Sequence, residues 1–177
     1  KTDATGNYLS DITATIQHET MFGADLDADG HIGIQVLEAI GDYSLGSGFK
    51  QYYIIDGSGN SIDLTKGGAL VRPGPSSVWK ATQVEESASG GFEVLWSHNN
   101  GNTAIWKTDA TGNYQSDITA TVWQNETTFE VDLDGDGYIG LKLTNIENNG
   151  DYKLAQGGNQ YYIIDGSGNS IDLTKGG

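Results

Sequence analysis

Hydrophobic and polar residues alternate in short runs along most of this chain, which is the period-two pattern of strands with one buried face. The clearest runs are residues 78–84, 92–96 and 103–107, all rich in aromatic and β-branched side chains. Polar segments with glycine separate the runs, and those at 97–102 and 109–113 are short enough to close hairpins. The pattern predicts an all-β protein of short strands in sandwich-like sheet units.

One turn sequence, Asp-x-Thr/Ser-Gly-Asn, occurs at residues 109–113 and again at 165–169. Its Asp side chain accepts hydrogen bonds from backbone N–H groups, and its Gly takes the left-handed conformation. We therefore predict that 109–113 leads into a strand over 114–122, and that 165–169 joins 161–164 to 170–173. Residues 141–147 are ambiguous, because a short helix there fits as well as a strand.

The sequence repeats itself. Residues 1–8 return unchanged as 107–114, and residues 51–68 are identical to 160–177, at an offset of 109. Such self-similarity is typical of tandem repeats. We predict two domains, with residues 69–177 forming one complete repeat and residues 1–68 the C-terminal two-thirds of another.

Two acidic loops have the spacing Asp-x-Asp-x-Asp-Gly, the first half of an EF-hand calcium loop. The glycine at position six provides the sharp turn, and position seven contributes a backbone carbonyl. This spacing predicts about two bound Ca²⁺ ions, one per loop. The expected ligands are the side chains of Asp25, Asp27, Asp29, Asp132, Asp134 and Asp136, with the carbonyls of His31 and Tyr138.

The bidentate glutamate of a true EF-hand is missing, because its position is occupied by Val36 and Leu143. A further ligand must then come from outside each loop. Glu19 and Glu126, six residues before their loops, are the first candidates. Magnesium is disfavoured because it resists dense all-protein cages, and an acidic turn without metal is the simplest alternative. The second choice of ligand is Asp42 and Asp151.

Composition excludes several classes of function. The 177 residues include 24 acidic and 9 basic ones, for a formal net charge of -15, and this charge repels nucleic acid and anionic membranes. There is no cysteine, so a disulfide scaffold and thiolate catalysis are ruled out. No apolar run approaches 18 residues, and we expect no insertion into a membrane.

Candidate chemistry beyond the loops is sparse. The three histidines belong to no acid–base arrangement with serine or carboxylates, so we expect no enzymatic activity. Trp79, Trp96 and Trp106 are expected as anchors of a hydrophobic core. The alternative is that tryptophans form exposed platforms that stack on sugar rings, and the candidates for this are Trp123, Trp96 and Trp106.

Three segments carry a resemblance to a known family: Phe-Glu-Val-Leu-Trp at 92–96, Ala-Ile-Trp-Lys-Thr-Asp-Ala-Thr-Gly-Asn-Tyr at 104–114 and Glu-Thr-Thr-Phe-Glu-Val-Asp-Leu-Asp-Gly-Asp-Gly-Tyr-Ile-Gly at 126–140. They resemble the tryptophan-rich repeat found towards the C-termini of large cyanobacterial and other bacterial secreted proteins. Those proteins are often similar to haemolysin-type or RTX-type calcium-binding proteins and surface adhesins. The resemblance covers nearly the whole chain and implies a secreted or cell-surface, calcium-loaded, non-catalytic module.

These observations lead to one expected function and one alternative. We expect an extracellular calcium-binding structural repeat of a bacterial surface, fibre-forming or adhesive protein. Because an incomplete repeat exposes a sheet edge, we expect head-to-tail association with itself or with adjacent repeats through that edge. The alternative is a carbohydrate-binding module that recognises surface glycans through exposed tryptophans.

Overall fold

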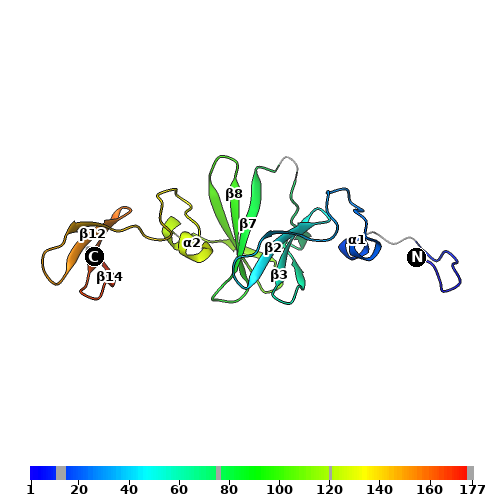
Figure 1. Ribbon diagram of the computed structural model, residues 1–177, viewed down its shortest axis with the longest axis horizontal. Coiled ribbons are helices and arrows are strands. Elements are labelled where there is room, and N and C mark those ends of the chain that lie inside the picture. Colours follow the sequence, from blue (N-terminus) through cyan, green and yellow to red (C-terminus); the bar gives the residue numbers. More distant parts are fainter. Residues whose placement is uncertain (11–14, 75–76, 120, 175–177) are drawn as a thin grey trace. The chain divides into compact units, whose positions relative to one another are not determined.

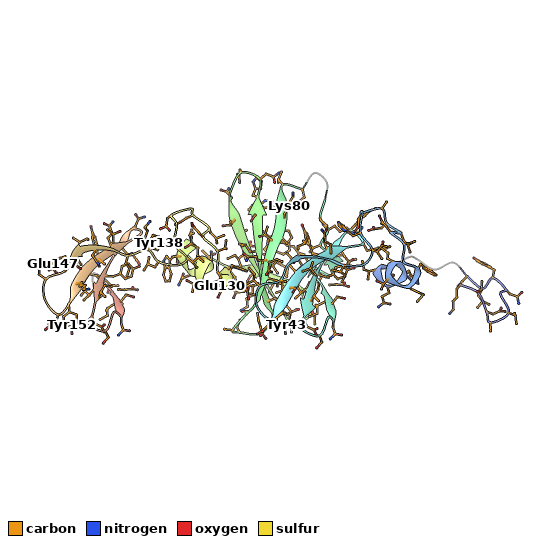
Figure 2. All side chains as sticks on the ribbon, in the orientation of Figure 1. Tyr43, Lys80, Glu130, Tyr138, Glu147 and Tyr152 are labelled. Atoms are coloured by element: carbon orange, nitrogen blue, oxygen red, sulfur yellow. The ribbon has the colours of Figure 1, made fainter. Side chains whose placement is uncertain are left out.

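The computed structural model describes residues 1–10, 15–74, 77–119 and 121–174, and these residues are mostly β (Figure 1). Within them lie three four-stranded antiparallel sheets, one two-stranded sheet and two short helices. The predicted all-β class is therefore confirmed. The chain divides into two compact units, residues 1–119 (unit 1) and residues 120–177 (unit 2).

Each four-stranded sheet of the described residues is a meander of hairpins, in the orders β1-β2-β3-β4, β10-β9-β8-β7 and β11-β12-β13-β14. The elements of unit 1 are α1 (Ile16–Phe22), β1 (Gln35–Glu38), β2 (Tyr43–Gly48), β3 (Gln51–Asp56), β4 (Ser61–Asp63), β5 (Thr65–Lys66), β6 (Ala69–Leu70), β7 (Trp79–Glu86), β8 (Phe92–His98), β9 (Thr103–Thr108) and β10 (Tyr114–Asp117). Those of unit 2 are α2 (Val122–Phe129), β11 (Thr144–Glu147), β12 (Lys153–Gly157), β13 (Gln160–Ile164) and β14 (Ser170–Asp172).

In unit 1 the β1–β4 sheet and the β7–β10 sheet share one hydrophobic core, and Figure 1 shows β2 and β3 beside β7 and β8. Alternate residues of β3, Tyr52 and Ile54, point into this core. From the other sheet comes Trp96, whose ring lies edge-on to Tyr52 with centroids 5.6 Å apart. Phe92 meets Tyr43 in the same way at 4.9 Å. The two sheets thus bury each other's apolar faces.

The opposite face of the β1–β4 sheet is covered by α1 and the chain that follows it. Gly48 in β2 makes this close approach possible, because a Cβ there would lie 2.7 Å from Cδ1 of Ile16. Gly46 similarly faces Ile34, with a contact of 2.4 Å for an added Cβ. The central strands of this sheet are therefore buried on both faces.

The Asp-x-Thr/Ser-Gly-Asn turns form as the sequence predicted. Asp109 Oδ1 accepts hydrogen bonds from the N–H groups of Thr111 (2.9 Å) and Asn113 (3.1 Å), and the turn joins β9 to β10. Asp165 makes the equivalent bonds with Ser167 and Asn169, both at 2.9 Å, between β13 and β14. Local hydrogen bonding within five residues is enough to fix each hairpin.

The structure resolves the ambiguity at residues 141–147, which hold the strand β11 and no helix. The two helices lie before the acidic loops, and the alternative of a short helix after each loop is not what the structure has. The strand expected over 114–122 ends at Asp117, because Thr121 caps the start of α2. Thr121 N–H donates to Oε1 of Gln124 at 3.0 Å, and the Gln124 N–H donates to the Thr121 carbonyl at 3.1 Å. The side chains of the two residues have the arrangement of a capping box.

The packing of the strands is offset from the sequence repeat. The boundary of the 109-residue repeat, between residues 68 and 69, falls inside unit 1, where β3 and β4 pack against β7 and β8. The β11–β14 sheet of unit 2 corresponds to β1–β4, with the same strand order and a bulge at the equivalent place in its first strand. No helix of the described residues is long and apolar enough to cross a membrane.

Candidate metal centre

A short helix positions a buried glutamate beside each acidic loop. Helix α1 begins after Thr15 and ends at Gly23, which has a left-handed conformation. Its central residue Glu19 is completely buried, and Glu126 in α2 is 1% exposed. Carboxylates are almost never so deeply buried without charged or hydrogen-bonding partners.

The Glu19 carboxylate closes the first loop with backbone hydrogen bonds. Its Oε1 accepts from the N–H groups of Leu26 at 2.9 Å and Asp27 at 3.3 Å. Its Oε2 accepts from the Gly33 N–H at 3.0 Å. One side chain therefore joins the helix to both ends of the loop.

The three aspartates of this loop also bond to the loop's own backbone. Asp25 accepts from the N–H groups of Asp29 (3.2 Å) and Gly30 (3.0 Å), and Asp27 Oδ1 accepts from Asp29 N–H at 3.0 Å. Asp29 Oδ1 accepts from His31 N–H at 2.9 Å. The bonds from Gly30, Ala28 and Asp29 outweigh burial, which alone would raise the pKa of Asp25, and the net pKa is lowered. The loop is thus already curved around its acidic side chains.

Three carboxylates converge in each loop. Oxygens of Glu19, Asp25 and Asp27 lie within 4.8 Å of one another, as do those of Glu126, Asp132 and Asp134. Of the candidates named from sequence, the third aspartates, Asp29 and Asp136, do not belong to these groups among the described residues, and neither do Asp42 and Asp151.

Asp27 carries the clearest sign of a missing partner. Its Oδ2 is buried and has no hydrogen-bond partner among the described residues. Burial, followed by the charges of Asp29, Glu19 and Asp25, raises the pKa of this carboxyl. A buried anionic oxygen without a donor is costly, and a cation among the three carboxylates would offset that cost.

The second loop repeats this arrangement. Glu126 Oε1 accepts from Leu133 N–H at 2.9 Å and Asp134 N–H at 3.2 Å, and its Oε2 accepts from Gly140 N–H at 3.0 Å. Asp132 Oδ2 accepts from Gly137 N–H at 2.9 Å, the main cause of its lowered pKa. The hydrogen-bond scheme is therefore a property of the loop sequence, reproduced in both units.

The loops differ at one cation that the sequence analysis did not single out. Lys142 Nζ donates to the Asp136 carbonyl at 2.8 Å and lies 4.0 Å from its carboxylate. The corresponding residue of the first loop, at an offset of 107, is the neutral Gln35. Lys142 therefore places a positive charge beside the second loop, and the equivalent position of the first loop is neutral.

The donor set fits a hard cation. Each group offers carboxylate oxygens from three side chains, and Ca²⁺ takes six to eight oxygen ligands in flexible geometry. Glu19 and Glu126, Asp25 and Asp132, and Asp27 and Asp134 are the residues that would hold such an ion. A bound ion would neutralise carboxylates that otherwise repel one another.

The tryptophans of unit 1 are largely covered. Trp96 is 6% exposed, with Tyr52 and Trp106 against its ring. The ammonium of Lys66 lies over Trp106, 4.4 Å from the ring centroid. Trp79 packs against the core and against His98. Trp96 is therefore buried in the core, and Trp106 is half-buried beside Trp96 and Lys66.

Trp123 has a different environment. It is half-buried on α2 and lines a hollow of about 840 Å³ within unit 2. The hollow is also lined by polar residues of the loop, of the β12–β13 turn and of the start of β13, including Asp134, Asn159 and Gln160. It combines the aromatic rings of Trp123 and Tyr162 with several hydrogen-bonding groups.

Comparison with protein families found one match. The family model described as Tryptophan-rich Synechocystis species C-terminal domain matches residues 43–140, which is more than half of the chain. The matched segment begins with β2 and ends with the second acidic loop. Comparisons with curated proteins and with solved structures gave no significant match.

Proposed function

The chain belongs to the family of the Tryptophan-rich Synechocystis species C-terminal domain, and from that premise we propose that it is a calcium-binding structural repeat. It acts without catalysis, as an exported element of a fibre-forming or adhesive protein of the bacterial surface. It binds about two Ca²⁺ ions, one in each acidic loop.

The observation that carries this proposal is the convergence of three carboxylates in both loops, with Asp27 Oδ2 buried and unpartnered among the described residues of the first. A turn that needed only its backbone hydrogen bonds would have no reason to bury a further anionic oxygen. The all-oxygen donor set and the density of carboxylates favour Ca²⁺ over Mg²⁺.

The ion would act as a structural link. Glu19 stands on α1, Asp25 and Asp27 belong to the loop, and the loop packs on the β1–β4 sheet. Burial, followed by the charges of Asp63, Glu19 and Asp27, raises the pKa of Tyr53 in β3 to about 12. An ion at this point ties helix, loop and sheet together, and its binding free energy adds to the stability of the fold.

Isothermal titration calorimetry of the full chain with Ca²⁺ tests the proposal. We expect about two sites, with one lost in Asp25→Asn/Asp27→Asn and the other lost in Asp132→Asn/Asp134→Asn. The matched control is Asp117→Asn/Asp172→Asn, which removes two exposed carboxylates from strands and keeps both sites. No heat of binding and no change of melting temperature with Ca²⁺ would reject calcium as the ligand.

Association with itself or with adjacent repeats belongs to the same proposal. It is supported by the sheet edges at β1, β4, β11 and β14, which end the two equivalent meanders. Analytical ultracentrifugation over a range of concentrations, with Ca²⁺ and with chelator, tests it. A single monomeric species under all conditions would argue against head-to-tail association of the chain through these edges.

Oligosaccharide binding is the second candidate, favoured by the polar hollow beside Trp123. An aromatic ring flanked by amides and carboxylates suits the apolar face and the hydroxyl groups of a sugar. Screening soluble oligosaccharides against the chain and Trp123→Ala tests it, with Trp79→Phe as a control outside the hollow. Binding that is unaffected by Trp123→Ala would exclude the hollow as a glycan site.

A further inference from the structure

We propose that one face of the β11–β14 sheet is a docking surface for a further sheet of the β7–β10 type. The partner is a repeat unit that continues from Gly177 as residues 69–119 continue from Gly68. The proposal deepens the structural role above by naming the partner and the surface, and it does not depend on the bound ion. The docking surface consists of Tyr152, Leu154, Tyr161, Ile163, Ile171 and Leu173.

Unit 1 contains the same surface in its covered state. The six residues recur with identical side chains at an offset of 109, on strands of the same order and register. Leu45 pairs with Ile54 across β2 and β3, and Leu154 pairs with Ile163 across β12 and β13. The counterparts in unit 1 are Tyr43, Leu45, Tyr52, Ile54, Ile62 and Leu64.

The two copies of this surface differ in burial. In unit 1 all six residues lie in or against the core shared with the β7–β10 sheet. Leu64 is 0% exposed there, and its counterpart Leu173 is 51% exposed. Tyr52 is 3% exposed and Tyr161 is 48% exposed. Unit 2 thus presents to solvent the same apolar side chains that unit 1 buries under a second sheet.

The exposure is specific to this face. On the opposite face of the sheet, Tyr53 and its counterpart Tyr162 are 4% and 3% exposed. A Cβ added at Gly157 would lie 2.7 Å from Leu141, and one added at Gly48 would lie 2.7 Å from Ile16. The side facing the helix and acidic loop is therefore closely packed at the central strands in both units, although by different residues.

Unit 2 also contains the counterpart of a glutamate that accepts a hydrogen bond from β7 in unit 1. In unit 1 Glu38 Oε1 accepts from Ile40 N–H, while its Oε2 accepts from Val84 N–H of β7 at 3.4 Å. In unit 2 the corresponding Glu147 accepts from Asn149 N–H through Oε1. Glu147 also lines a shallow hollow of about 420 Å³ with Tyr152, Leu154, Ile163 and Ile171. The hollow has the acceptor and the apolar lining that β7 meets in unit 1.

The identity of the occupant follows from the repeat. The 18 residues up to Gly177 are identical to those up to Gly68, so a segment like residues 69–119 would leave β14 along the same path. In a second copy of this chain, by contrast, Val94 and Trp96 of the β7–β10 sheet are already buried against that copy's own β1–β4 sheet. A following repeat unit is therefore the fitting partner.

The test extends the full chain by a second copy of its own residues 69–119 after Gly177. Since the chain has no cysteine, Leu173→Cys provides a single reactive probe on the docking surface. We expect the thiol to react with a maleimide at least about tenfold more slowly in the extended chain than in the unextended chain. Leu64→Cys is the matched control and reacts slowly in both.

A second extended chain carries aspartate in place of the appended counterparts of Val94 and Trp96, and the probe in it should react as fast as in the unextended chain. Hydrogen exchange of Tyr161 and Ile163 amides, without any cysteine, should show the same protection. Equal labelling with and without the intact appended sheet overturns the proposal. Protection in the unextended chain that grows with concentration overturns it too, in favour of a second copy. The labelling is repeated in Ca²⁺ and in chelator. Comparison of the two conditions separates a failure of sheet docking from a failure to bind calcium.

Discussion

The Gly140 N–H donates a hydrogen bond of 3.0 Å to Oε2 of Glu126, across 14 residues of chain. Together with the bonds from Leu133 and Asp134 to Oε1, it makes one buried carboxylate the fixed point around which the second acidic loop folds. The first loop has the same bond between Glu19 and Gly33. The loop geometry therefore depends on the helix that precedes it.

Replacing Glu126 with glutamine should loosen the second loop, because an amide nitrogen would face backbone N–H groups that now meet an anion. Hydrogen bonds to charged groups contribute roughly 1.5–3 kcal/mol, so we expect a loss of about 2 kcal/mol in the free energy of local unfolding. Hydrogen exchange at Gly140 measures it. The control, Glu130→Gln at the exposed end of α2, should change this free energy little. Equal effects of the two variants would contradict the conclusion that the Glu126 carboxylate holds the loop.

Asp27→Asn should change stability in opposite directions with and without calcium. In chelator, the substitution removes repulsion from Asp29, Glu19 and Asp25, and we expect the melting temperature to rise by about 2–4 °C. In Ca²⁺ the variant loses a ligand and should melt below the unmodified chain. Thermal unfolding in chelator and in Ca²⁺ measures the two changes in melting temperature. A change of the same sign under both conditions would contradict the role of Asp27 as a ligand.

Lys142→Gln should tighten calcium binding in the second loop. The lysine ammonium lies 4.0 Å from the Asp136 carboxylate and repels an incoming cation. Exposed charge pairs contribute roughly 0.2–1 kcal/mol, which corresponds to an affinity increase of about 1.4- to fivefold. Calorimetry on chains whose first loop is disabled isolates this site. Lys153→Gln on β12 changes net charge equally and should leave the affinity nearly unchanged.

The N-terminal turn should keep its ionised aspartate to unusually low pH. Hydrogen bonds from the side chains of Thr5 and Asn7, foremost that of Thr5, lower the pKa of Asp3 from 3.8 to about 2. Because the folded pKa is depressed, this stabilisation is present above about pH 4 and is lost as the pH falls through 2. Carbon-detected NMR titration of the carboxyl measures the midpoint. Thr5→Val should move it upwards, and an unchanged midpoint would contradict the assignment.

Leu64→Ala and Leu173→Ala compare identical residues in different surroundings. Leu64 is fully buried between two sheets, so its truncation should cost about 2–4 kcal/mol in the unfolding of unit 1. Leu173 is half exposed, and its truncation should cost less than about 1 kcal/mol. Denaturant unfolding followed by NMR resonances of each unit separates the two values. Equal costs would mean that the second sheet is also covered.

Sequence alone predicted the parts of the fold that depend on local bonding. The Asp109 and Asp165 turns need only hydrogen bonds within five residues, and their hairpins are where the pattern predicted them. The sequence pattern did not predict the helices, and the strand predicted over 114–122 extends into the first residue of α2 because Val122 favours strands. The overlooked signal was Thr121 followed three residues later by Gln124, a capping box.

The candidate site was predictable in its composition but not in its geometry. The spacing singled out the six loop aspartates together with Glu19 and Glu126, and the structure groups three carboxylates of each set. That Asp29 and Asp136 turn instead towards the backbone of residues 31 and 138 depends on loop dihedral angles, which spacing does not encode. Which sheet covers which face depends on contacts between distant strands, and a repeat boundary at residue 68 does not reveal it.

The 18 identical residues of 51–68 and 160–177 have a consequence for how the repeat number can vary. A deletion or duplication of one 109-residue period with both ends inside this stretch would rejoin the flanking segments without altering any residue at the junction. Since the stretch contains β3 and β4, the strands after the junction always meet the same apolar face, whichever copy they follow. The number of repeats could therefore change by one whole period without creating an unmatched core.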